Sequence, residues 1–135
     1  MTEFTVHLSN RPGMLAALAT LIARAGVNID AMAAFGIDEE GIVRIVADDA
    51  EATRLTLRDA GVSFAERTVL TTHVSNKPGS LADLTNELAR CRVNIEAMYL
   101  LHTTAEEQVF ALAVDNYDRA EDALYGSETT RSAVS

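Results

Sequence analysis

Two short stretches of the sequence carry residues that suit binding of a small zwitterion. Each has an asparagine two residues before a Pro-Gly pair, in Asn10-Arg11-Pro12-Gly13 and again in Asn76-Lys77-Pro78-Gly79. One asparagine amide can accept a hydrogen bond from an ammonium group and donate one to a carboxylate. The glycine permits a tight turn and, having no Cβ, lets a ligand approach the backbone. The two stretches therefore carry groups that could bind a small ligand with both charges.

A helix is expected to begin directly after each of these turns. In the first copy, Leu15, Leu18 and Ile22 share one face of a helix over about residues 13–25. Gly26 follows as a residue that can end it. The N-terminus of a helix presents unpaired N–H groups and partial positive charge, which suit a carboxylate. The asparagine and the helix start can together bind an ammonium group and a carboxylate of such a ligand.

The two stretches belong to a long internal repeat. The segment His7–Met32 returns as His73–Met98 at a constant offset of 66, and 15 of the 27 positions in 6–32 are identical in 72–98. Beyond residue 36 the copies align only with one residue inserted in the second. The repeat predicts two modules, residues 1–68 and 69–135. Because each is too small to bury a large core alone, we expect the two to share one.

Each copy follows the pattern of a β-α-β-β-α-β unit, which is the ferredoxin-like arrangement of the α+β class. In the first strand Phe4, Val6 and Leu8 alternate with polar residues, as a half-buried strand requires. The elements predicted for the first copy are strands over 4–9, 27–35, 41–47 and 62–70 and helices over 13–25 and 50–60. Those predicted for the second are strands over 70–75, 93–102 and 108–114 and helices over 79–91 and 117–125.

The second copy departs from the first at two places. Arg92 replaces the glycine that ends the first helix, which should cost about 1 kcal/mol if that position is left-handed. After Gly126 only nine polar, weakly patterned residues remain, so the last strand of this copy is expected to be short or missing. A sheet with one strand unfilled exposes an edge that a partner chain can cover, which favours a homodimer.

Together with Val27-Asn28-Ile29 and Val93-Asn94-Ile95, the two loops resemble the signature of ACT domains. These are small amino-acid-sensing modules that occur on enzymes such as phosphoglycerate dehydrogenase and on the acetohydroxyacid synthase regulatory subunit. The resemblance covers essentially the whole chain. It implies two tandem ferredoxin-like ACT units, each an antiparallel sheet with its helices on one face.

The resemblance also implies where a ligand would bind. In ACT proteins the ligand usually lies where two units meet, between the loop of one and the start of the second strand of the other. The first implied site combines Asn10, Arg11, Pro12, Gly13, Met14 and Leu15 with Asn94 and Ile95. The second combines Asn76, Lys77, Pro78, Gly79, Ser80 and Leu81 with Asn28 and Ile29.

Two functions compatible with these residues stay open. The first is a non-catalytic regulatory protein that binds a free amino acid at the interface between its two ACT units. The alternative is a ligand-independent regulatory subunit that assembles with a metabolic enzyme. In that case each loop asparagine serves only as a turn and an Asx cap on its helix, and Asn28 and Asn94 bond their own backbone.

Composition argues against several other classes. A net charge of −9 with a single lysine disfavours nucleic-acid binding, and no apolar run is long enough for a membrane span. With no visible secretory signal and one cysteine, the chain is expected to be cytoplasmic, without disulfides or a Cys-rich zinc site. His7 and His73 supply one outward histidine per copy, too few for zinc. No nucleophile with a neighbouring base and no phosphate-binding glycine motif is present, so we expect neither catalysis nor a cofactor.

Overall fold

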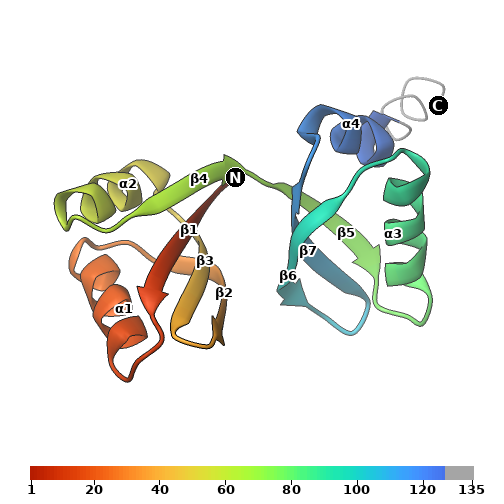
Figure 1. Cartoon of the computed structure of the whole chain (residues 1–135). Coiled ribbons are helices and arrows are strands. Elements are labelled where there is room, and N and C mark those ends of the chain that lie inside the picture. Colours follow the sequence, from red (N-terminus) through yellow and green to blue (C-terminus); the bar gives the residue numbers. More distant parts are fainter. Residues whose placement is uncertain (127–135) are drawn as a thin grey trace. The chain divides into compact units, whose positions relative to one another are not determined.

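The computed structural model describes residues 1–126 of the chain, and its contacts divide it into two units between Arg67 and Thr68 (Figure 1). The first unit consists of β1 (Thr2–Ser9), α1 (Met14–Arg24), β2 (Ile29–Ile37), β3 (Glu40–Ala47), α2 (Ala50–Asp59) and β4 (Phe64–Thr68). Its sheet has the strand order β2-β3-β1-β4, with β3 antiparallel to both β1 and β2. The predicted β-α-β-β-α-β order is confirmed.

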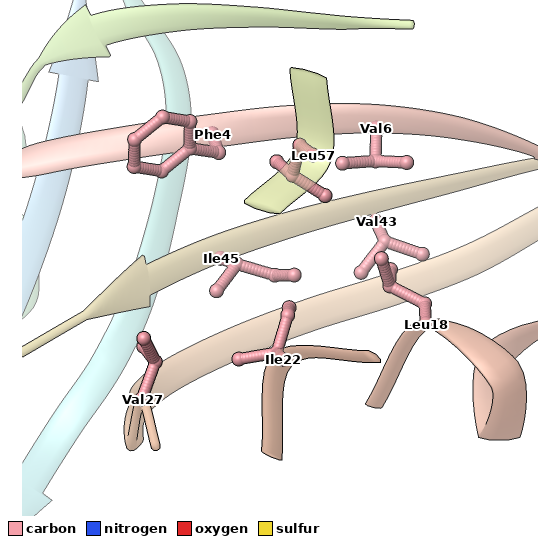
Figure 2. Close-up of a cluster of buried hydrophobic side chains, with 8 residues drawn as sticks. All are labelled: Phe4, Val6, Leu18, Ile22, Val27, Val43, Ile45 and Leu57. Carbon is pink, nitrogen blue, oxygen red and sulfur yellow. The ribbon is translucent and has the colours of Figure 1, made fainter. Parts of the chain in front are cut away.

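The helices of the first unit cover one face of its sheet because alternate strand residues are apolar. Phe4 and Val6 of β1 point to the same face as Val43 and Ile45 of β3, as the period of two predicts. Figure 2 shows these four side chains meeting Leu18, Ile22, Val27 and Leu57 in one buried cluster. Fully burying each larger side chain contributes roughly 1.5–3 kcal/mol, so this cluster holds α1 and α2 on the sheet.

The second unit repeats the design with β5 (Leu70–Ser75), α3 (Ser80–Arg90), β6 (Ile95–Thr103), β7 (Glu107–Val114), α4 (Tyr117–Glu121) and a π-helical segment, η1 (Asp122–Gly126). Its sheet has the order β5-β7-β6. The last strand of this copy, expected to be short or missing, falls at 127–135 and lies outside the described residues.

Each unit has a hydrophobic core of its own. The core of the second unit is formed by Leu70, Leu84, Leu88, Val93, Leu112, Val114 and Ala120, none of which belongs to the first cluster. The expectation that each module is too small to bury a core of its own is therefore wrong. Two helices closing over one sheet bury enough apolar side chains for a separate cluster, even in a unit of this size.

The residue inserted in the second copy forms a β-bulge. The pairing register of β6 with β7 shifts between Leu100 and His102, whereas β2 pairs with β3 without a shift over the corresponding residues. Leu101 is thus the extra residue. Each strand position after it in the second copy corresponds to the residue 67 positions earlier in the first copy. A bulge absorbs one residue without breaking the sheet, which explains why the repeat drifts there and the fold does not.

Helices α1 and α3 end in the same hydrogen-bonded motif. After α1, the Gly26 N–H donates to the Ala23 carbonyl and the Val27 N–H to the Ile22 carbonyl. After α3, the Arg92 N–H makes the equivalent bond to Ala89. Gly26 has φ of 74° and Arg92 has φ of 58°, so the arginine occupies a left-handed position and meets the condition under which a cost was expected.

Candidate functional site

The loop between β1 and α1 exposes the start of the helix. Gly13 is the residue before the helix and has φ of 87°, and Gly79 holds the same position before α3 with φ of 92°. A Cβ built on either glycine would meet no other atom of the described chain within 4 Å. Glycine is needed there for its backbone conformation, and the space in front of the helix is open.

The loop asparagines do not cap these helices. Within the described residues, neither α1 nor α3 receives a side-chain hydrogen bond at its N-terminus, so the Asx-cap interpretation is wrong. Instead, Asn10 Nδ2 donates to the Asp38 carbonyl at 2.9 Å, and Asn76 Nδ2 donates to the Thr104 carbonyl at 2.7 Å. Each asparagine therefore ties its loop to the turn of the following β-hairpin.

This tie fixes the orientation of the Asn10 amide. Because only the NH₂ group can donate to the Asp38 carbonyl, Oδ1 is left on the other side of the amide as an acceptor. The Asn10 backbone N–H also donates to the turn, to the Glu39 carbonyl at 2.8 Å. An oriented acceptor beside an exposed helix N-terminus is the arrangement that an amino acid's ammonium and carboxylate groups require.

Asn10 also depends on a glycine that the sequence analysis did not single out. A Cβ on Gly36 would lie 2.4 Å from Asn10 Nδ2, so the amide packs directly on the bare backbone of β2. Gly36 pairs across the hairpin with Gly41. The available sequence signal was a glycine on each side of the expected turn, Gly36 directly after the predicted strand 27–35 and Gly41 at the start of the next. Glycine in a strand often marks close approach by another group.

A cavity of about 210 Å³ lies beside this loop in the first unit. Its walls come from the loop, the start of α1 and the ends of β2 and β3, and its lining residues are Leu8, Ser9, Asn10, Arg11, Met14, Leu15, Ala34, Phe35, Gly36, Gly41, Ile42 and Val43. Four of the predicted site residues are among them. Arg11 Nη2 lies 3.8 Å from Met14 Sδ, which places the guanidinium along the first turn of α1.

The other half of each predicted site lies at the opposite end of the sheet. In the first unit Ser9 pairs with Glu40 at one end of β3, and Ile29 pairs with Ala47 at the other. The structure therefore does not bring Asn28 and Ile29 together with the loop of their own unit. The same holds for Ile95, which pairs with Val114, while Ser75 pairs with Glu107.

The asparagines that precede β2 and β6 are anchored by an aspartate. The Asn28 N–H donates to Asp48 Oδ1 at 3.0 Å, and the Asp48 N–H returns a bond to the Asn28 carbonyl. Asn94 and Asp115 make the same reciprocal pair. The Asn28 side chain donates to Asp30 Oδ1, so bonding to its own backbone is not what holds it. The repeated Asp-Asp and Asp-Asn pairs after β3 and β7 were the sequence signal for this anchor.

The two strand histidines each face a carboxylate across the sheet. His7 Nδ1 lies 2.6 Å from Glu40 Oε1, and His73 Nδ1 lies 3.1 Å from Glu107 Oε1. All four side chains are about half exposed or more. Among residues 1–126, no group of three or more histidine, cysteine, aspartate or glutamate side chains is placed to hold a metal ion.

Solved structures similar to this chain share its fold over nearly its full length. Protein BT0572 from Bacteroides thetaiotaomicron has a TM-score of 0.86 at 22% identity, covering 94% of this chain and 88% of its own. The ligand-free regulatory subunit of aspartate kinase from Thermus thermophilus has a TM-score of 0.67 at 16% identity, with coverages of 95% and 90%. A structure of aspartokinase alpha and beta subunits has a TM-score of 0.68 at 17% identity, with coverages of 95% and 92%.

No helix within residues 1–126 is long and apolar enough to cross a membrane.

Comparison of the sequence with family models identifies the family, although no curated protein matches the chain. A family model described as an ACT domain pair matches residues 1–129. Since that match spans nearly the whole sequence, this chain belongs to the ACT domain pair family.

Proposed function

We propose that this chain is a non-catalytic regulatory protein that binds a free amino acid at its Asn-x-Pro-Gly loops. The observation that carries the proposal is the oriented Asn10 amide beside the uncapped start of α1, at the mouth of a cavity. The ammonium group of the ligand bonds to Asn10 Oδ1. Its carboxylate meets the first N–H groups of α1 and the Arg11 guanidinium, and its side chain enters the cavity.

The ligand lies at an interface between two ACT units in this proposal. Asn28 and Ile29 are remote from the loop of their own unit, so a site built from both motifs needs two units. Asn94 and Ile95 complete the site at Asn10–Leu15, and Asn28 and Ile29 complete the one at Asn76–Leu81. Binding then changes the packing between units and, through it, contacts with another protein.

The alternative, a ligand-independent subunit that assembles with a metabolic enzyme, is favoured by one observation. Both loop asparagines already make a structural hydrogen bond to a hairpin turn, so each has a role in an unliganded unit. Two of the similar structures carry subunits of aspartate kinase in their names. In this alternative the chain would hold the same protein partner with and without amino acids.

Calorimetric titration with the twenty amino acids separates these functions. The sensor proposal expects at least one to bind with Kd below about 1 mM, which corresponds to roughly −4 kcal/mol. Arg11→Ala should weaken that binding about tenfold to a hundredfold, because a charge-assisted hydrogen bond is worth about 1.5–3 kcal/mol. Arg24→Ala removes the same charge from the exposed far end of α1 and should leave Kd unchanged. Failure of all twenty to bind would favour the alternative.

We also propose that the chain forms a homodimer, because large apolar side chains remain exposed along β2 and β6. Met32, Phe35 and Ile37 of β2 are 46–59% exposed, and Leu100 of β6 is 46% exposed. Covering such side chains is the usual reason that soluble proteins associate. Light scattering should give about twice the chain mass of 14.5 kDa, and a monomer at working concentration would contradict the proposal.

A further inference from the structure

We infer that the first unit holds a site selective for an amino acid with an aliphatic side chain, and that the second unit does not duplicate this site. The inference rests on the proposed amino-acid binding and adds the class of ligand and the unit that takes it. The two loops have the same backbone design, but the side chains around them differ in size and charge.

The cavity of the first unit favours an uncharged side chain. Leu8, Leu15, Ala34 and Val43 form apolar walls, and Arg11 is the only charged residue among the described residues that line it. A charged ligand side chain would lie against these apolar walls without an opposite charge beside it, at a cost in free energy. With Arg11 engaged by the carboxylate, nothing in this lining compensates that cost.

The size of the cavity points to a short side chain. Its volume of about 210 Å³ is below the roughly 300–1,000 Å³ typical of pockets for drug-sized ligands. The Gly36–Gly41 pair forms part of the lining with backbone alone. An aliphatic amino acid fills such a space with atoms that need no hydrogen-bond partner.

The second unit carries larger residues at the strand positions that border this cavity. Matching the strand pairs of the two hairpins gives Leu100 and Phe110 where the first unit has Ala34 and Val43. Beyond the bulge, the pair Thr103 and Gln108 takes the place of the two glycines. All four substitutions add side-chain atoms where the first unit has space.

The loop of the second unit instead borders a charged groove. Lys77 and Ser80 line a groove of about 570 Å³ along β5, together with Asp83 and Glu87. Asp83 lies in the first turn of α3, whereas the first turn of α1 has no acidic residue. A ligand carboxylate at the start of α3 would face this negative charge, so the helix N-terminus of the first unit is the better donor site for a ligand carboxylate.

Titration of the full chain with leucine, isoleucine, valine, aspartate, glutamine and lysine tests the inference. An aliphatic amino acid should bind with one site per chain and at least tenfold more tightly than aspartate, glutamine or lysine. Ala34→Leu places the residue of the second unit into the first at an exposed strand position, and it should weaken aliphatic binding at least tenfold. Phe110→Val gives the second unit the residue that the first has at the matched strand position, and it should leave that affinity within twofold.

The outcomes separate this inference from the function on which it rests. Binding of an amino acid to two equal sites per chain, or tightest binding of a charged or polar amino acid, would overturn the inference and leave the sensor function standing. So would unchanged affinity in Ala34→Leu, once circular dichroism shows that the variant is folded. If none of the twenty amino acids binds, the proposed function fails and the inference fails with it.

Discussion

At the scale of single residues, Asn10 and Gly36 depend on each other. The asparagine bonds the hairpin turn through its amide, and it can lie there only because Gly36 has no Cβ in its path. A residue that looks like a ligand-binding group is thus also part of the framework of the first unit. The proposed binding role does not conflict with this structural one, because the structural bond uses Nδ2 and leaves Oδ1 able to accept.

Gly36→Ala should therefore disturb Asn10 specifically. The new methyl group would displace the amide and break its bond to the Asp38 carbonyl, which should lower the free energy of unfolding by about 1 kcal/mol. Gly41→Ala is the matched control across the hairpin, since its Cβ would lie 3.5 Å or more from the nearest atoms. Urea unfolding of both variants measures the difference. Equal stability of the two would show that Asn10 adapts without loss.

Arg92 offers a second test at this scale. Its left-handed backbone costs a non-glycine residue roughly 1 kcal/mol, so Arg92→Gly should raise the free energy of unfolding by about that amount. The reciprocal Gly26→Arg should lower it by a similar amount, because Gly26 ends α1 in the same motif. Chemical denaturation of both variants measures these changes in the free energy of unfolding. A loss of stability in Arg92→Gly would mean that the arginine side chain makes contacts worth more than its backbone strain.

The residues that sequence could and could not predict differ in how far apart their partners lie. The position of Gly13 before a helix and that of Arg92 after one were predictable because each depends only on the adjacent turn or helix end. The bond from Asn10 to Asp38 spans 28 residues and depends on the register of the hairpin, which no local pattern specifies. For the same reason, the sequence alone does not show that Gly36 makes room for the Asn10 amide, because this depends on β2 lying beside the loop.

At the scale of elements, alternation and helical spacing predicted the strands and helices to within a few residues. Strand β5 has the predicted bounds, and α1 begins one residue after the predicted start. The inserted residue was detected as an offset in the repeat, but its form as a bulge at Leu101 needed the pairing of β6 with β7. The expectation that neither unit could bury a core alone failed because chain length does not show how much of its sheet a unit's own helices cover.

An ion pair holds β4 against α2, and its effect should depend on pH. Arg54 Nε and Nη2 donate to Glu66 Oε2 and Oε1 at 2.6 and 2.8 Å, and this hydrogen bonding lowers the pKa of Glu66. A carboxyl with a lowered pKa in the folded state stabilises the fold above its unfolded pKa, and this contribution is lost as the pH falls through the folded value.

Glu66→Gln should therefore flatten the loss of stability on acidification. The wild-type chain should lose more of its free energy of unfolding between about pH 5 and 3 than the variant, and the two should converge at the acid end. Urea unfolding at several pH values measures this, with Glu39→Gln in the β2–β3 turn as a control of equal charge change. If the two variants have the same pH dependence, the Arg54–Glu66 pair does not stabilise the fold, as holds for many exposed pairs.

At the scale of the whole molecule, two units with separate cores carry loops that share a backbone and differ in their surroundings. The repeat preserves the left-handed glycine, the asparagine bond to the hairpin and the aspartate anchor in both copies. What diverges is the set of side chains facing the cavity and the charge in the first turn of the helix. A duplicated framework with one altered site would let a single chain respond to one ligand while the other unit serves assembly.

Hydrogen exchange with a bound amino acid tests whether the site lies between units. A ligand at 100 times its Kd stabilises the bound form by about 2.7 kcal/mol, and amides that exchange by opening that form should slow accordingly. We expect protection of residues 10–15 and 34–43 of the first unit together with residues 94–95 of the second. Because each unit has its own core, protection spreading over the first core without any change at 94–95 would place the site within one unit. That result would overturn the interface proposal and leave amino-acid binding itself intact, whereas protection of both segments would support a sensor that acts through the packing of its units.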